Sequence, residues 1–311
     1  MNENLKVVTV TLNPAIDLTG TTDTVKIGKV NVLQTGCLHP AGKGINVAHV
    51  LSNLGANVTV TGFLGENNQQ AFVDLFTDLN VTDKFIRVKG DTRINVKISE
   101  TSGQMTDLNF PGILVDEKSI AELERCLFSL ANNHGIFVIA GSLPQGFPPT
   151  RLASWIKKLQ QCGKKVFFDS SHQALTEGTK SHPFLIKPND DELSVLIDTP
   201  LCCDQEIHFA AKKLQSNGCE NVVVSLGEKG VIWCDQQGVL KSTPPSVKVL
   251  STVGAGDTLV AGLCWGEINN WKKEKTLSFA TALSAMAVTQ TLVGVTNFDA
   301  LKHLEKEVLL S

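Results

Sequence analysis

The sequence predicts an α/β fold in which helices cover both faces of a mostly parallel β-sheet. Segments with the pattern of strands alternate with segments with the pattern of helices along most of the chain. The strand-like segments are almost continuously apolar, which is typical of strands buried on both faces of a parallel sheet. Of the 311 residues, 42% are hydrophobic and 19% are charged, and no linker rich in Pro, Gly or Ser divides them. We therefore expect one domain over residues 1–311.

Each element follows from a local pattern. Residues 7–12 (Val-Val-Thr-Val-Thr-Leu) are mostly β-branched and predict the first buried strand. Similar runs predict strands at residues 58–64, 136–140, 165–168, 184–186 and 222–226. Apolar residues at helical spacing predict helices at residues 45–54, 69–79, 119–130, 151–159, 206–214 and 278–286 and one that starts near Leu259.

Two segments, approximately residues 18–38 and 84–110, interrupt this alternation with short strand-like pieces that have no helix between them. Polar and apolar residues alternate from Arg93 to Lys97, so a strand would place Arg93, Asn95 and Lys97 on one side. Two interpretations are open. The segments form an ordinary solvated sheet face, or a small lid whose polar side closes over an anionic ligand.

Charge and composition exclude several classes of function. The net charge is −3 and there is no basic tract, which argues against nucleic acid as a partner. No stretch approaches the roughly 20 apolar residues of a membrane span, and the first 12 residues lack the pattern of a signal peptide. The eight cysteines include no Cys-x-x-Cys pair, which indicates reduced thiols and a cytoplasmic protein.

The most informative motif is Gly254-Ala255-Gly256-Asp257, which precedes an apolar helical pattern. Glycines bring backbone N–H groups close to an anion, and the helix start adds its own N–H groups and positive dipole end. A carboxylate beside such a phosphate site can accept a proton from an attacking hydroxyl. The alternative is an ordinary loop in which Asp257 caps the helix. Because a helix N-terminus stabilises negative charge, we expect the pKa of Asp257 to lie below its usual range.

Polar or glycine-rich loops also follow other predicted strands, at the edge where ligands bind in open α/β sheets. Asp17 can accept hydrogen bonds from vicinal sugar hydroxyls or close an Asx turn. Gly42-Lys43-Gly44 opens the first helix, with Asn46 one turn on, and suits a phosphate or sugar oxygens. Gly141-Ser142 ends the middle strand at the same edge.

Two further loops lie farther along the chain. Lys187 follows a strand, and the spacing of Asn189 and Glu192 places both on one helical face, where their oxygens suit Mg²⁺ held through water. A helix cap by Asn189 is the alternative, and both can hold together. Residues 225–230 predict a tight turn between strands, either a ligand loop or a plain hairpin.

Taken in order, these motifs resemble those of the PfkB family of ribokinase-like sugar kinases. The matching stretches are Asn13-Pro14-Ala15-x-Asp17, Gly42-Lys43-Gly44-x-Asn46, Gly141-Ser142-Leu143-Pro144, Lys187-Pro188-Asn189-x-x-Glu192, Ser225-Leu226-Gly227 and Gly254-Ala255-Gly256-Asp257. Residues 39–48, 92–97 and 251–253 are most similar to family members that phosphorylate fructose 1-phosphate. The resemblance implies a ribokinase-like sheet with a small β-strand lid, and transfer of the γ-phosphoryl group of ATP to O6 of fructose 1-phosphate, giving fructose 1,6-bisphosphate and ADP.

The resemblance also implies residue roles. Asp257 is the catalytic base, and the backbone N–H groups of Gly254, Ala255 and Gly256 form an anion hole. The sugar is held by Asp17, Gly42, Asn46 and Ser142, and its phosphate by Lys43 and Arg93. ATP is bound by Lys187, Asn189, Ser225, Gly227, Gly230, Ser251, Thr252 and Val253. The resemblance further implies Mg²⁺ held through water by Asn189 and Glu192, K⁺ near the Asp257 loop in some relatives, and a homodimer formed through the lids.

Other functions compete with this one. Tagatose-6-phosphate kinases share the Gly-Lys-Gly-x-Asn and Thr-Arg elements. A non-catalytic sugar-phosphate sensor on the same fold is a second alternative, but a binder has no need of Asp257. A nicotinamide-dependent oxidoreductase would have a glycine fingerprint after its first strand, where this chain has Asn13-Pro14-Ala15.

Overall fold

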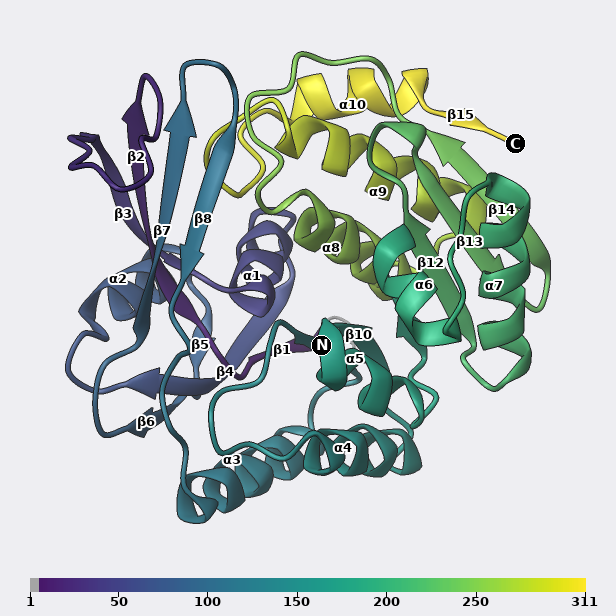
Figure 1. Cartoon of the computed structure of the whole chain (residues 1–311). Helices are drawn as coiled ribbons and strands as arrows, with labels where there is room; N and C mark the ends of the chain where they lie inside the picture. Colours follow the sequence, from purple (N-terminus) through teal and green to yellow (C-terminus); the bar gives the residue numbers. More distant parts are fainter. Residues whose placement is uncertain (1–5) are drawn as a thin grey trace.

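Eleven strands form the central sheet of the computed structural model, which describes residues 6–311 (Figure 1). Its strands are β1 (Lys6–Thr11), β4 (Asn57–Gly65), β5 (Thr82–Asp83), β6 (Ile86–Val88), β9 (Ile136–Ala140), β10 (Lys165–Asp169), β11 (Leu185–Ile186), β12 (Asn221–Ser225), β13 (Val231–Asp235), β14 (Gly238–Thr243) and β15 (Leu309–Leu310). The order is β15-β14-β13-β12-β11-β10-β9-β1-β4-β5, with β6 also paired to β4. Pairing is parallel from β5 and β6 to β12 and antiparallel from β12 to β15. The mostly parallel sheet is therefore confirmed, and the antiparallel edge is additional.

Helices cover both faces of this sheet, as the sequence predicts. They are α1 (Lys43–Asn53), α2 (Gln70–Asp78), α3 (Glu117–Leu130), α4 (Pro149–Gln161), α5 (His172–Thr179), α6 (Asp190–Ile197), α7 (Asp204–Ser216), α8 (Ala255–Ile268), α9 (Lys273–Ala287) and α10 (Phe298–Glu307). One core packs under α1, α2, α8, α9 and α10, and the other under α3 to α7. Successive side chains of a strand point to opposite faces, so Val7 lies in the first core and Val8 in the second.

Four further strands form a separate sheet that stands beside the central one (Figure 1, left). They are β2 (Ala15–Thr22), β3 (Gln34–Ala41), β7 (Arg93–Glu100) and β8 (Met105–Asn109), in the order β3-β2-β7-β8. We call this sheet the lid. The sequence placed the second lid segment from about residue 84, whereas the structure pairs Ile86–Val88 with β4 in the central sheet.

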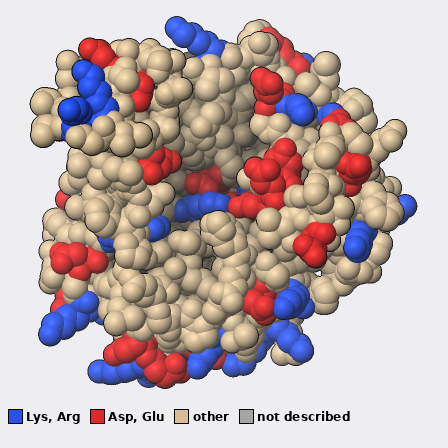
Figure 2. All heavy atoms as spheres, in the orientation of Figure 1, with Lys and Arg blue, Asp and Glu red and all other residues tan. Residues whose placement is uncertain are grey.

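The two faces of the lid differ in chemistry. Cross-strand partners share a face, and the register pairs Asp17 with His39 and Asn95, and Asn95 with Asn109. The opposite face carries an apolar row across the same strands, made of Leu38, Leu18, Val96 and Leu108. The lid thus presents one polar face and one apolar face, and Figure 2 shows a hollow between lid and core with charged side chains at its floor.

No helix within residues 6–311 is both long and apolar enough to cross a membrane.

Candidate active site

The glycine loop leads directly into α8, as the sequence predicts. The N-cap is Gly254 at φ 76°, a left-handed conformation that favours glycine. Asp257 is the third residue of α8 and is only 7% exposed. Since the cap position belongs to Gly254, the alternative of Asp257 as an ordinary helix cap does not hold.

A single side chain from another helix holds Asp257. Asn46 of α1 donates a hydrogen bond from Nδ2 to Oδ2 of Asp257 at 2.7 Å. Burial raises the pKa of Asp257 to about 6, and the nearby charge of Asp169 acts in the same direction, against Lys43, Asn46 and Lys187. The expectation of a lowered pKa is therefore wrong: desolvation outweighs the stabilisation at the helix N-terminus.

Asp169 is a site residue that the sequence reasoning missed. It ends β10, is 1% exposed, and its Oδ1 lies 3.2 Å from Nζ of Lys43 and 3.5 Å from Nζ of Lys187. Within residues 6–311, its buried Oδ2 has no hydrogen-bond partner. The signal was a carboxylate at the end of an apolar parallel strand, one residue beyond the predicted 165–168 segment.

Lys43 lies among the acidic side chains of the site. Burial lowers its pKa, but the carboxylates of Asp169, Asp257 and Glu192 together raise it above the usual value. The ammonium group is therefore charged, and it lies beside Asp169 within the electrostatic influence of Asp257, whereas Arg93 contacts other groups.

A cavity of about 880 Å³ adjoins the glycine loop. Its lining includes six residues of the predicted site, which are Ser225, Gly227, Gly230, Thr252, Ala255 and Gly256. The loop of residues 244–249 and α9, through Thr281 and Ser284, complete the wall. Four other residues predicted to bind ATP are not among the described residues that line this cavity: Lys187, Asn189, Ser251 and Val253. Residues 225–230 form a hairpin turn with a 3₁₀ segment (Gly227–Lys229) that also borders this cavity.

Asn189 and Glu192 form a capping box at the start of α6. Asn189 Oδ1 accepts from the Glu192 N–H at 2.7 Å, and Glu192 Oε2 accepts from the Asn189 N–H at 3.0 Å. The cap interpretation of Asn189 is confirmed. It occupies one oxygen of each side chain, so a metal role would fall to the remaining Oε1 of Glu192.

The polar face of the lid carries the other predicted residues. Asp17 is 4% exposed, accepts from Asn95 Nδ2 at 3.1 Å, and its Oδ2 lies 3.6 Å from Lys97 Nζ. Arg93 donates to the carbonyl oxygens of Asn13, Pro14 and Phe110 at 3.1, 3.3 and 2.9 Å.

Ser142 connects the lid side to the core. Its Oγ accepts from Asn13 Nδ2 at 3.1 Å. Gly42 is the N-cap of α1, directly before Lys43, at φ 146°. The structure therefore brings Lys43, Asn46 and Lys187 to the carboxylates of Asp169 and Asp257. It brings Gly42, Arg93 and Ser142 to the residues 13–14 that precede Asp17.

Comparison with known proteins agrees with this arrangement. Residues 4–298 match the model of the pfkB family carbohydrate kinases. The chain belongs to this family. It is 52% identical to a 1-phosphofructokinase of Vibrio cholerae, over 98% of this chain and 96% of the relative. It is 31% identical to a tagatose-6-phosphate kinase of Staphylococcus epidermidis, over 97% of this chain and 98% of the relative.

Solved structures of pfkB kinases have the same fold. Phosphofructokinase-2 of Escherichia coli, in a structure described as a complex with potassium, superposes with a TM-score of 0.90 at 29% identity, covering 97% of this chain and 98% of that one. The ribokinase-like fold is thereby confirmed, and as a member of this kinase family the chain is a phosphotransferase.

Proposed function

We propose that this pfkB kinase transfers the γ-phosphoryl group of ATP to O6 of fructose 1-phosphate, giving fructose 1,6-bisphosphate and ADP. The observation that carries the proposal is the buried carboxylate of Asp257 in the first turn of α8, directly after a glycine loop that borders a large cavity. The similarity to 1-phosphofructokinases supports the choice of substrate.

In the proposed reaction, Asp257 accepts the proton of the O6 hydroxyl as the O6–P bond forms and the bond from phosphorus to the β,γ-bridging oxygen breaks. ADP leaves with the electron pair of that bond, and the proton passes from Asp257 to solvent. N–H groups of Gly254, Ala255 and Gly256 stabilise the charge on the moving phosphoryl group. A base with a pKa near 6 is charged at neutral pH and still able to hold a proton.

The two lysines beside Asp169 serve the phosphoryl group in transfer. Lys187 is 4% exposed and its Nζ would lie 3.5 Å from a Cβ at Gly256, so it reaches the phosphate side of the glycine loop. Lys43 shares the same carboxylate oxygen. We therefore place Lys43 at the transferred group, in place of the sugar-phosphate role that the resemblance implies.

The sugar binds between the core and the polar face of the lid in this proposal. Asp17, Asn46 and Gly42 hold its hydroxyl groups, and Arg93 and Ser142 hold its phosphate. The guanidinium group of Arg93 donates to three backbone carbonyls, which fix its position. Because these carbonyls are neutral, they do not cancel its positive charge.

Replacing Arg93 by Ala should raise KM for the sugar phosphate by about 10- to 100-fold, since a charge-assisted hydrogen bond to phosphate is lost. KM for ATP should stay within about twofold, because Arg93 contacts backbone next to the lid strands and is not among the residues that line the cavity proposed for ATP. Steady-state kinetics with each substrate varied in turn measures both values. Equal effects on the two KM values would show that Arg93 is not a phosphate ligand.

ATP binds, in this proposal, in the cavity of about 880 Å³. Ser225, Gly227 and Gly230 line one side of it and Thr252 another, with Ser251 and Val253 adjacent in the chain. Thr281 and Ser284 of α9 are the candidates for contact with the adenine ring, because this helix closes the cavity.

Mg²⁺ is the cofactor that we propose. The donors fit it: the buried Oδ2 of Asp169 lacks a partner within the described chain, and Glu192 has an oxygen beyond its capping bond. Asp169 and Glu192 would hold the ion, through water in part, while Asn189 acts as the cap that positions Glu192 and not as the ligand that the resemblance implies. The ion supplies charge neutralisation on the phosphates of ATP.

K⁺ is proposed as an activator bound by backbone carbonyls near the Asp257 loop. The N–H groups of Leu250 and Ser251 donate to the carbonyl of Val288 at 2.7 and 3.3 Å, and a Cβ at Gly254 would lie 2.9 Å from Val293, so the segment after α9 lies close to the Asp257 loop. We expect kcat to be higher in KCl than in choline chloride of equal ionic strength. Equal kcat in the two salts would refute the K⁺ site.

A homodimer formed through the lids is the proposed assembly. Leu38 and Leu108 on the apolar face of the lid are 58% and 53% exposed, and a second copy of this face would cover them. Leu108→Lys should shift the protein from dimer to monomer in sedimentation velocity. Leu309→Lys on β15, a site that is 69% exposed, is the matched control and should leave the mass unchanged. A monomeric wild type would rule out the dimer.

A cytoplasmic location completes the proposal. All eight cysteines, which lie within the described part of the chain, are free, as expected for a reducing compartment.

The proposed activity is tested by ADP production from Mg-ATP with fructose 1-phosphate, fructose 6-phosphate, tagatose 6-phosphate and ribose compared side by side. We expect the highest kcat/KM with fructose 1-phosphate. Preference for tagatose 6-phosphate would favour the alternative substrate, and no turnover with any sugar would favour a sugar-phosphate sensor.

A further inference from the structure

The turn that follows β4 holds the first residues of lid strand β7. The side-chain amide of Asn68 bonds to both backbone groups of Thr92: Oδ1 accepts from the N–H at 2.8 Å, and Nδ2 donates to the carbonyl at 2.8 Å. Thr92 is 3% exposed, and its Oγ1 accepts from the Gly65 N–H at 2.9 Å. The chain is thus fixed on both sides at the residue before Arg93.

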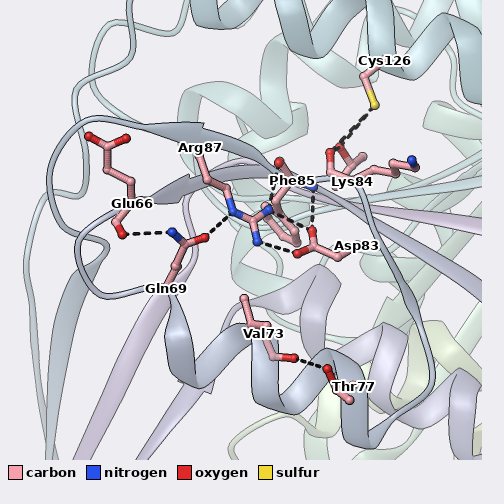
Figure 3. A network of polar contacts seen from close by, with 10 residues as sticks. Glu66, Gln69, Val73, Thr77, Asp83, Lys84, Phe85, Arg87 and Cys126 are labelled. Carbon is pink, nitrogen blue, oxygen red and sulfur yellow. Dashed lines mark hydrogen bonds and ion pairs between the residues drawn. The ribbon is translucent and has the colours of Figure 1, made fainter.

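This turn is itself held firmly. The N–H groups of Glu66 and Asn67 donate to the carbonyls of Val88 and Gly90 at 3.0 and 3.1 Å. Gln69 donates to the Glu66 carbonyl at 3.0 Å and accepts from Arg87 Nε at 2.6 Å. Figure 3 shows Arg87 lying between Gln69 and Asp83, with which it forms a two-pronged ion pair. Asn68 therefore projects from a turn with little freedom of its own.

The position of Thr92 determines where β7 starts against β2. In the register of these strands, Arg93 lies opposite Ala15 and Asn95 opposite Asp17. A shift at Thr92 would move Arg93 away from the carbonyls of Asn13 and Pro14. It would also change the bond between Asn95 and Asp17.

We propose that Asn68 is a positioning residue for the sugar-phosphate site: it acts through Thr92 to place Arg93 and Asn95. The proposal rests on the proposed function, in which Arg93 binds the phosphate of the sugar. It does not involve the ATP cavity, whose lining comes from residues 225 to 288.

The test compares Asn68→Ala with Asn67→Ala. Asn67 is the matched control, because its side chain is exposed and, among the described residues, donates only to Asp91, at 3.3 Å. With the best sugar phosphate of the panel, Asn68→Ala should raise the KM of that substrate about tenfold, as for one or two lost hydrogen bonds. KM for ATP should stay within about twofold, and Asn67→Ala should match the wild type.

A double-mutant cycle with Arg93→Ala separates positioning from general destabilisation. If Asn68 acts through Arg93, Asn68→Ala adds little to the KM of Arg93→Ala. Asn68→Asp, which keeps the acceptor but loses the donor, provides a second variant of similar size should the alanine variant fold poorly.

Three results would overturn the inference: an unchanged KM for the sugar phosphate in both Asn68 variants, an equal rise in both KM values, or full additivity with Arg93→Ala. In each case the proposed function still stands if the single variant Arg93→Ala has a raised KM for the sugar phosphate. If Arg93→Ala is active and its KM for the sugar phosphate is unchanged, Arg93 does not bind the phosphate of the sugar. Asn68 then cannot act through Arg93.

Discussion

Asp257→Asn is expected to lower kcat by two orders of magnitude or more, on the scale of a lost general base, while both KM values change little. Asn has nearly the same shape and can still accept the hydrogen bond that Asn46 donates at 2.7 Å, so the site keeps its geometry. What is lost is the ability to take the proton from O6. Steady-state kinetics of the purified variant measures the effect, and an unchanged kcat would exclude Asp257 as the base.

The pH dependence provides an independent check. The base works only when deprotonated, so kcat/KM should fall as pH drops through the pKa of Asp257, near 6. The phosphate of the substrate also titrates at about pH 6. The pH dependence of the residual kcat/KM of Asp257→Asn is therefore the control. In this variant only the titration of the substrate phosphate should remain. An identical acid limb in both proteins would assign the whole limb to the substrate.

Loss of stability does not explain the expected loss of activity. Because the folded protein holds the proton of Asp257 more tightly than the unfolded chain, Asp257 makes folding less favourable as pH rises from about 4 to about 6. The cost above that range is at most about 3 kcal/mol. Asn carries no charge, so the variant should unfold at the same or a higher temperature at pH 7.

Features that depend on neighbouring residues could be predicted from the sequence. The strand at residues 7–12 and the turn into α8 at Gly254 follow from β-branched runs and from glycine next to a helical pattern. The cap formed by Asn189 and Glu192 is equally local, since three residues separate the two partners.

Features that depend on distant packing could not be predicted. The raised pKa of Asp257 is one such feature: the helix terminus is visible in the sequence, whereas the burial of the carboxyl group depends on chain segments far away. Asp169 meets Lys43 across 126 residues and Lys187 across 18, and nothing local pairs them. The hydrogen bonds between Asn68 and Thr92 likewise depend on the pairing of β6 with β4. The sequence of residues 84–88 alone does not indicate this pairing.

Lys43→Met is expected to lower kcat about 100-fold, on the scale of one lost group that stabilises charge in the transition state, with a smaller change in KM for the sugar phosphate. The reason is the position of the ammonium group, 3.2 Å from Asp169 and within the charge field of Asp257 and Glu192. Lys180→Met is the control, since that lysine side chain is 64% exposed and, within residues 6–311, pairs only with Glu177.

The two possible roles of Lys43 give different results. A ligand of the phosphate already on the sugar would behave like Arg93, with a large rise in KM and a smaller fall in kcat. A group at the transferred phosphoryl would also influence the base, because the charge of Lys43 lowers the pKa of Asp257. Its removal should then move the acid limb of kcat/KM to higher pH, a shift that Arg93→Ala should not cause. If Lys43→Met leaves that limb in place and changes only KM for the sugar phosphate, Lys43 belongs with Arg93. The structure favours the role at the transferred phosphoryl group, because the ammonium group of Lys43 lies 3.2 Å from Asp169 and the carboxylates of Asp169, Asp257 and Glu192 raise its pKa.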